Sequence, residues 1–197
     1  MRLVILDRDG VINEDSDAYI KSPAEWVPIP GSLEAIARLC RYEYRVVIMT
    51  NQSGVARGLY NMDTLNKIHN RMLDQIHQKG GQIDAILFCP HGPDDHCECR
   101  KPKAGMFYEL AERLKVNLTG VPSVGDSLRD LQAAQVVNAL PVLVCTGKGA
   151  EAREQLVSTG SAIADIPVFE DLSAFAEGLL TGSLDEQMDA LLHANRG

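Results

Sequence analysis

Two aspartates, Asp7 and Asp9, stand two residues apart at the end of the apolar run LVIL in the sequence LVILDRDG. Residues at that spacing on a strand point to the same side, so both carboxylates can face one ligand. A third carboxylate, Asp126, occurs in SVGDS, at the end of another short apolar run. Three converging carboxylates suit a hard divalent cation such as Mg²⁺. The pattern therefore predicts a magnesium site, although Asp7 and Asp9 alone would also fit a solvated turn.

The sequence MTNQSG, which ends the apolar run RVVI, offers hydroxyls, an amide and consecutive backbone N–H groups. The side chains are those of Thr50, Asn51, Gln52 and Ser53. Such a turn can bind an anion, but it is also an ordinary way to end a strand. Lys101, in the sequence RKP, supplies a cation that could balance a phosphate. Together these groups favour phosphoryl transfer, which depends on positioning and charge neutralisation.

Three of the five cysteines and one histidine fall in the pattern C-x-H-x5-C-x-C. The residues are Cys89, His91, Cys97 and Cys99. Three thiolates and one imidazole predict a closed, structural zinc site with no coordination position left for catalysis. His96 is a rival ligand next to Cys97, whereas His69 and His77 fit ordinary surface or helix-face positions. Cys40 and Cys145 lie in apolar surroundings, where we expect buried core thiols.

Apolar runs alternate with helical patterns along almost the whole chain. Strands are expected at 3–6, 45–51, 83–89, 139–147 and within 121–127. Helices are expected at 32–42, 62–81, 104–116, 130–137, 149–160 and 172–180. This alternation predicts βαβ units, and hence a Rossmann-like, doubly wound α/β fold with a mostly parallel sheet. In that fold the polar residues at the carboxyl ends of the strands gather at one edge.

The length of 197 residues fits one domain. We expect a single domain over residues 1–180, with a zinc loop at 89–99 and a peripheral C-terminal segment at 181–197. Residues 11–30 form an irregular stretch that is too short for a lid, so we interpret it as a long functional loop. No cap domain is expected.

The net charge is −8, from 19 basic and 27 acidic residues. An acidic balance opposes a nucleic-acid partner and a zinc-finger module, because phosphate backbones need a basic face. A small anionic substrate is compatible with it, since a few local cations and a metal suffice. The N-terminus does not resemble a signal peptide, and no apolar run reaches the roughly 18 residues of a membrane span. We therefore expect a cytoplasmic monomer without a membrane partner.

The motifs DRDG, TNQS, RKP and GDSLRD, in this order, resemble those of the haloacid-dehalogenase-like (HAD) phosphohydrolases. The resemblance covers roughly residues 2–180. It implies that Asp7 is the nucleophile, which becomes an aspartyl-phosphate, and that Asp9 is the general acid and base. It also implies that Thr50 and Lys101 stabilise the transferring phosphoryl group.

In this resemblance Mg²⁺ is held by the Asp7 carboxylate, the Asp9 backbone carbonyl and Asp126. Asp130 would be a supporting or helix-start residue. A zinc loop before RKP is similar to one HAD branch, which includes phosphatases that remove the C7 phosphate of a heptose 1,7-bisphosphate and histidinol-phosphate phosphatases. The stretches 13–28 and TNQSGVARG favour the heptose reading and, with it, a role in making nucleotide-activated heptose for lipopolysaccharide or surface glycans. Histidinol phosphate is the alternative substrate, and a non-catalytic zinc protein is the alternative of another class.

Without a cap, substrate selection would come from the loops 13–28, 53–60 and 89–101. Arg100 is placed to bind a second phosphate or sugar hydroxyls through its guanidinium. Arg57 and Tyr19 are weaker candidates, since each would also fit a surface or loop-packing role. The expected substrate contacts are Asp7, Arg8, Asp9, Tyr19, Thr50, Asn51, Gln52, Ser53, Arg57, Arg100 and Lys101.

Overall fold

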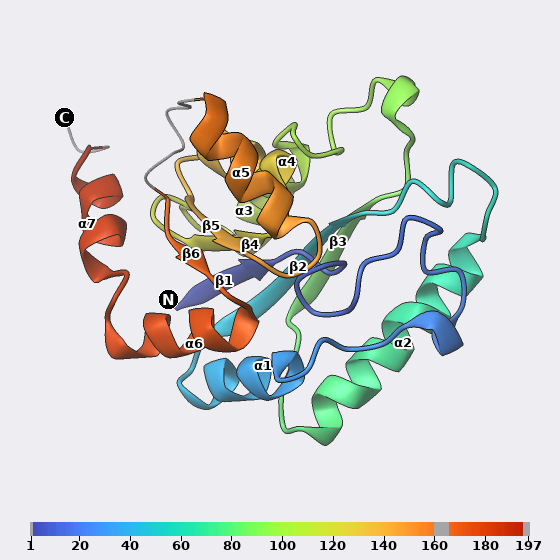
Figure 1. Cartoon of the computed structure of the whole chain (residues 1–197), viewed down its shortest axis with the longest axis horizontal. Helices are drawn as coiled ribbons and strands as arrows, with labels where there is room; N and C mark the ends of the chain where they lie inside the picture. Colours follow the sequence, from blue (N-terminus) through green and yellow to red (C-terminus); the bar gives the residue numbers. More distant parts are fainter. Residues whose placement is uncertain (1, 160–165, 195–197) are drawn as a thin grey trace.

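A parallel sheet of six strands runs through the computed structural model, which describes residues 2–159 and 166–194 (Figure 1). The strands are β1 (Leu3–Leu6), β2 (Arg45–Asn51), β3 (Ala85–Cys89), β4 (Pro122–Gly125), β5 (Leu140–Val144) and β6 (Val168–Phe169). Their order is β3-β2-β1-β4-β5-β6, and each neighbouring pair is parallel. This is the doubly wound, Rossmann-like order. The predicted fold class is confirmed, while β6, with only two residues, was not foreseen.

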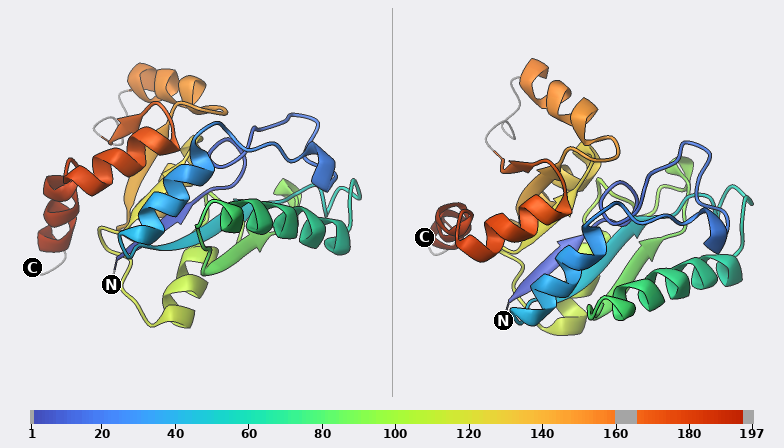
Figure 2. Two further views of the ribbon diagram at one scale, coloured as in Figure 1. Left: turned by 90° about the horizontal axis from the view of Figure 1, so that it is seen from below. Right: turned by 60° about the horizontal axis from the view of Figure 1, so that its bottom comes forward.

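Helices cover both faces of the sheet (Figure 2). One face carries α1 (Ser32–Arg41), α2 (Met62–Gln78) and α6 (Leu172–Thr181). The other carries α3 (Gly105–Leu114), α4 (Leu128–Val136) and α5 (Gly149–Thr159). The chain also has α7 (Asp185–Ala194) and two short 3-10 turns, η1 (Pro23–Glu25) and η2 (Pro93–Asp95). The helices begin and end within a few residues of the predicted ranges.

The continuous apolar run of β1 is explained by burial on both of its faces. Val4 and Leu6 belong to the core beneath α1, α2 and α6. Leu3 and Ile5 belong to the core beneath α3 and α4. Successive side chains of a strand point to opposite faces, so a strand covered on both sides has no polar position.

The C-terminal segment contributes to the core. Leu184 is buried among the residues beneath α6, and Met188 and Leu191 of α7 pack against the same cluster. The apolar core therefore continues past residue 180, where we had placed the domain boundary. Within the described residues, no helix has the length and apolar character of a bilayer span.

The stretch 11–30 is a packed loop. Its apolar side chains Val11, Ile12, Ile20 and Trp26 are buried. Asn13 forms isolated bridges with Asp9 and Pro28, so the loop folds back against the end of β1. These contacts fix the loop beside the first two aspartates.

The strand order reverses at β1, which lies between β2 and β4. Leu6 is level with Ile48 of β2 and Val124 of β4. The residues that follow these strands therefore emerge side by side at the carboxyl edge of the sheet. Crevices at such a reversal are the usual ligand sites of doubly wound folds.

Candidate active site

Asp7 and Lys101 form the centre of the site. Asp7 directly follows β1, and its backbone N–H donates to the carbonyl of Val124 at 2.9 Å. The Lys101 ammonium lies 3.1 Å from Asp7 Oδ1 and 2.6 Å from Asp130 Oδ1, and it donates to the Met49 carbonyl at 2.7 Å. Burial alone would lower the pKa of Lys101, but the two carboxylates raise it above its ordinary value. Lys101 is therefore a buried, charged group next to Asp7.

Asp130 holds both Lys101 and the start of α4. Its carboxylate accepts hydrogen bonds from the backbone N–H of Ser127, at 3.1 Å, and from the Ser127 hydroxyl. Ser127 is the N-cap of α4, so this is a capping box. Burial would raise the pKa of Asp130, but Lys101 and Arg129 lower it. The structure thus gives Asp130 the helix-start position that we expected.

Among the described residues, the buried carboxylate of Asp126 has no cationic side chain as a partner. It is 2% exposed, and its Oδ2 accepts a hydrogen bond from the backbone N–H of Lys148 at 2.9 Å. In the described part of the chain, no lysine or arginine side chain forms an ion pair with it. Burial, followed by the negative charges of Asp130 and Asp7, raises the pKa of Asp126 to about 8. Burial also raises the pKa of Asp7, to about 6, although Lys101 opposes the shift.

The carboxylates of Asp7, Asp126 and Asp130 each place an oxygen within 4.8 Å of the others. Asp130 uses Oδ1 for Lys101 and Oδ2 for Ser127, whereas Asp7 meets both Lys101 and the Arg8 backbone N–H through Oδ1. Asp7, through Oδ2, and Asp126 are therefore the side chains that would hold a cation. Hard oxygen ligands and uncompensated negative charge fit Mg²⁺. Gly10 keeps this space open: it has φ +78°, and a Cβ there would lie 2.0 Å from Asp126 Oδ2.

Asp9 points into a different set of partners. Its carboxylate accepts hydrogen bonds from Arg8 at 2.9 Å, from Asn13 Nδ2 at 2.9 Å and from Gln52 Nε2 at 2.8 Å. Burial would raise the pKa of Asp9, but the Arg8 guanidinium and the hydrogen bonds from Asn13 and Gln52 lower it. The side chain is 21% exposed, so one edge stays accessible. The Asp9 carboxylate lies outside the cluster that fits a metal.

We had expected Arg8 to contact the substrate, but its side chain is buried beneath the site. It is 1% exposed, and its guanidinium is hydrogen-bonded to Asp9, to Gln52 Oε1 at 3.1 Å and to His69 Nε2 at 3.4 Å. His69 lies on the buried face of α2, against the Phe88 ring, which agrees with the expected helix-face position and excludes the expected surface position. Burial, followed by the charge of Arg8, lowers the pKa of His69 to about 4. A neutral imidazole can accept a hydrogen bond from the guanidinium.

The turn after β2 links the remaining groups. Gln52 Nε2 donates to Thr50 Oγ1 at 2.9 Å, which leaves the Thr50 hydroxyl proton free to donate elsewhere. Asn51 exchanges two hydrogen bonds of 3.1 Å with the backbone of Lys101. Its side chain therefore fixes the lysine, which is a different task from the substrate contact that we predicted. Ser53 is buried in the same turn.

The Cys-His loop gathers the four predicted zinc ligands. One atom of each lies within 4.8 Å of the others, in the set Cys89, His91, Cys97 and Cys99. The donors are 3.1 to 3.6 Å apart, with His91 Nδ1 facing the thiols. A tetrahedral site with Zn–S bonds of about 2.3 Å has sulfurs about 3.8 Å apart. The three sulfurs are 3.1, 3.5 and 3.6 Å apart, so a small outward shift would give the zinc spacing, and three thiols with one imidazole are ligands that suit zinc. His96 lies outside the group, and Cys40 and Cys145 are half-buried where we had expected core positions.

Loops form the outer walls of the site. Arg57 is exposed and its guanidinium lies over the ring of Tyr19, 5.9 Å from the centroid, which joins the stretches 53–60 and 13–28. Arg100 donates one hydrogen bond to the His91 carbonyl at 3.3 Å. A cavity beside the zinc loop is lined by Gly92, Pro93, His96, Cys97, Arg100, Lys101, Pro102 and Lys103. Its lining is cationic, in an acidic protein.

The loop after β5, which carries Thr146 and Lys148, also borders the site, although it was not among the predicted site residues. The Lys148 ammonium lies 3.0 Å from Asp17 and 3.5 Å from Asp15, while the Thr146 hydroxyl donates to the Gly10 carbonyl at 2.6 Å. These contacts attach the stretch 13–28 to the metal-binding edge. The rule that polar groups gather at strand ends would have found TGK, had it been applied to the fifth strand as well.

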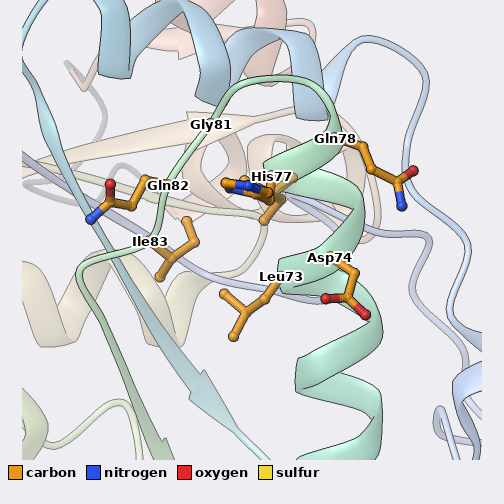
Figure 3. A pocket seen from close by; sticks show the side chains of 8 residues that line it. Leu73, Asp74, His77, Gln78, Gly81, Gln82 and Ile83 are labelled. Carbon is orange, nitrogen blue, oxygen red and sulfur yellow. The ribbon is translucent and has the colours of Figure 1, made fainter.

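A second cavity lies at the far end of α2, between that helix and the chain leading into β3 (Figure 3). It is lined by Leu73, Asp74, Ile76, His77, Gln78, Gly81, Gln82 and Ile83. It contains none of the predicted site residues.

Two family models match the chain. The model described as polynucleotide kinase 3 phosphatase matches residues 3–130, and the model described as HAD-hydrolase-like matches residues 98–174. Both fit the order of motifs that suggested a HAD phosphohydrolase.

Several curated proteins and solved structures are similar over most of their length. The D-glycero-beta-D-manno-heptose-1,7-bisphosphate 7-phosphatase of Bordetella bronchiseptica is 56% identical, over 91% of this chain and 98% of that protein. The protein of the same name from Pseudomonas putida is 52% identical, over 91% and 100%. The crystal structure of the B. bronchiseptica D,D-heptose 1,7-bisphosphate phosphatase with magnesium and phosphate has a TM-score of 0.87 and 55% identity, over 92% of this chain and 99% of that chain. The histidinol-phosphate alternative gains no support from these relatives.

Proposed function

Because the chain belongs to the family of D-glycero-beta-D-manno-heptose-1,7-bisphosphate 7-phosphatases, we propose that it hydrolyses the C7 phosphate of that heptose bisphosphate. The observation that carries the proposal is the contact of the buried Lys101 ammonium with Asp7, beside a carboxylate pair suited to Mg²⁺. The names of the relatives favour the β anomer as the substrate. Such an enzyme would supply heptose 1-phosphate for nucleotide-activated heptose.

Asp7 is the nucleophile. One of its carboxylate oxygens forms a bond to phosphorus as the bond between phosphorus and the sugar oxygen breaks, which gives an aspartyl-phosphate. Lys101 and the free proton of the Thr50 hydroxyl stabilise the oxygens of the transferring group. Bound Mg²⁺ would be held by Asp7, Asp126 and the Asp9 carbonyl, and it would neutralise negative charge on the phosphoryl group.

Asp9 moves the protons. Asp9 must enter the first step protonated, although Arg8, Asn13 and Gln52 lower its pKa in the free protein, and it gives this proton to the departing sugar alkoxide. In the second step a water attacks phosphorus and passes its proton to Asp9, while the bond from phosphorus to Asp7 breaks. The products are the sugar alcohol and inorganic phosphate, and Asp7 and Asp9 return to their starting states.

The cationic cavity beside the zinc loop supports a site for the second phosphate, at C1. Within the described residues, the Arg100 guanidinium forms one hydrogen bond, to the His91 carbonyl, so its other N–H groups can bind a ligand. A guanidinium suits a phosphate because two N–H groups can meet two oxygens. Zinc in the Cys-His cluster would hold this loop in shape, as all four ligands come from the protein.

The decisive experiment measures phosphate release with and without Mg²⁺. The substrates are the two anomers of the heptose 1,7-bisphosphate, fructose 1,6-bisphosphate and histidinol phosphate. We expect the highest kcat/KM for the β-heptose bisphosphate and no turnover without Mg²⁺. A comparable or higher kcat/KM for histidinol phosphate would refute the assignment.

A further inference from the structure

Tyr60 is a buried tyrosine just outside the groups that would touch the substrate. It is 8% exposed and directly precedes Asn61, the N-cap of α2. Its hydroxyl donates to Gln52 Oε1 at 2.7 Å. Burial raises the pKa of Tyr60 to about 12, so the phenol keeps its proton.

The Gln52 amide has a single orientation that satisfies its neighbours. Oε1 accepts hydrogen bonds from Tyr60 and from Arg8 Nη2, and Nε2 donates to Asp9 Oδ2 and Thr50 Oγ1. In the reversed orientation, the NH₂ group would face Arg8, which can only donate, and the amide oxygen would face the Asp9 carboxylate, which can only accept. Arg8 and Asp9 therefore select the orientation in which Gln52 binds Asp9. In that orientation Tyr60 donates a second hydrogen bond to Oε1 and holds the amide in place.

The absence of a side chain at Gly54 leaves room for the Tyr60 ring. A Cβ at Gly54 would lie 2.3 Å from Tyr60 Cε1 and 2.8 Å from its hydroxyl oxygen. The Gly54 carbonyl also accepts a hydrogen bond from the Leu59 N–H at 2.9 Å. The turn thus closes around the ring, and the start of α2 holds its backbone. The close approach of Gly54 and the hydrogen bond to Gln52 together fix the position of the hydroxyl.

We propose that Tyr60 is a positioning residue for Asp9, and that it acts through the Gln52 amide. The inference rests on the proposed function, because it assigns Tyr60 to the proton transfers of that reaction. Without the hydroxyl, Gln52 Oε1 keeps only Arg8, and the NH₂ group is held less firmly against Asp9. Asp9 then spends less time where it can deliver a proton to the departing oxygen.

The variant Tyr60→Phe tests this inference because it removes one oxygen and keeps the ring. The assay compares heptose 1,7-bisphosphate with p-nitrophenyl phosphate, whose leaving group departs without a proton. One neutral hydrogen bond corresponds to a fall in kcat of about 3- to 10-fold for the sugar substrate. We expect KM for the sugar to stay unchanged, and kcat/KM for the aryl phosphate, which reports the first step alone, to change by less than about 2-fold.

The matched control is Tyr44→Phe. Tyr44 is half-buried and stacks with Arg2 near the start of β2, at the opposite end of the strand from Thr50. Its loss should leave kcat unchanged for both substrates. If Tyr60→Phe does not fold, Gln52→Met takes its place, since it removes the amide and keeps the length of the side chain. The same difference between the two substrates is expected.

The outcomes distinguish failure of the proposed function from failure of the role of Tyr60. A wild-type protein that releases no phosphate from the heptose bisphosphate would overturn the proposed function. In an active wild-type background, an unchanged sugar kcat in Tyr60→Phe would overturn the role of Tyr60 alone. Equal falls in kcat/KM for both substrates, or a change in KM only, would also overturn it, because kcat/KM reports the first step, in which the aryl leaving group needs no proton from Asp9.

Discussion

Replacing Asp126 with asparagine should stabilise the metal-free protein while abolishing its activity. Asp126 is buried, and its charged form is disfavoured by burial and by Asp130 and Asp7, so its pKa is about 8 in the folded state. The asparagine carries no charge and can still accept the 2.9 Å hydrogen bond from the Lys148 backbone. The substitution therefore removes a cost of folding and a metal ligand together, which is a conflict between stability and function.

The sign and the size of the effect follow from linkage. The pKa of Asp126 is raised in the folded state, from 3.8 to about 8. Such a group favours folding below its unfolded pKa, and this contribution is lost as the pH rises through the folded value. Each unit of pKa difference corresponds to about 1.4 kcal/mol, so keeping Asp126 protonated in the folded state, while the unfolded carboxyl is ionised, costs the wild type up to about 4 kcal/mol at pH 7. Asp126→Asn avoids this cost at pH 7.5, and the two proteins should be equally stable near pH 4.

Urea unfolding at pH 4 and pH 7.5, in Mg²⁺-free buffer and with excess Mg²⁺, measures both the gain in stability and the loss of Mg²⁺ binding. We expect Mg²⁺ to stabilise the wild type at pH 7.5 and to leave the variant unchanged. The exposed Asp189→Asn of α7 is the control, and it should behave like the wild type. A variant that is no more stable than the wild type in Mg²⁺-free buffer at pH 7.5 would refute the reasoning. An advantage of equal size at pH 4 would refute it as well.

Three further outcomes can be checked on the same protein. Asp7→Asn should abolish phosphate release while the fold is retained, as measured by turnover and circular dichroism; retained turnover would exclude the aspartyl-phosphate route. Lys101→Met leaves two buried carboxylates, Asp7 and Asp130, without their cation, so the free energy of unfolding should fall by about 3 to 5 kcal/mol at pH 7 and turnover should be lost. Cys97→Ser should lower the amount of bound zinc and the melting temperature, and it should raise KM before it lowers kcat. Cys145→Ser, the control, should keep the zinc content of the wild type. Unchanged zinc content in Cys97→Ser would contradict the assigned ligand set.

The sheet and the place of the site were predictable from the sequence for a simple physical reason. Apolar runs such as LVIL must be buried on both faces, and their alternation with amphipathic helices leaves few arrangements other than a doubly wound sheet. The polar residues after those runs then have to meet at one edge. Asp7, Lys101 and Asp126 do lie together there, although they are far apart in the chain.

The partners of individual side chains were not predictable in this way. Arg8 and Asn51 were both expected at the substrate, but each is used inside the protein. The choice depends on which side chain fills a given space after the chain has folded, as when His69 takes the position beside Arg8. Periodicity identifies the face of a helix or strand, and it does not identify the atom that receives a hydrogen bond.

The loop from Cys89 to Lys101 shows how an acidic protein can present cations to a phosphate. Lys101 follows Cys99 by two residues, so a metal held by the Cys-His cluster would fix the chain just before it. Asn51 fixes the backbone of Lys101 itself through two hydrogen bonds, and Asp7 and Asp130 hold the ammonium. Each of these restraints acts within a few ångströms, where burial weakens screening and one well-placed charge outweighs the distant surface charges. The net charge of −8 therefore does not oppose an anionic substrate at this edge of the sheet.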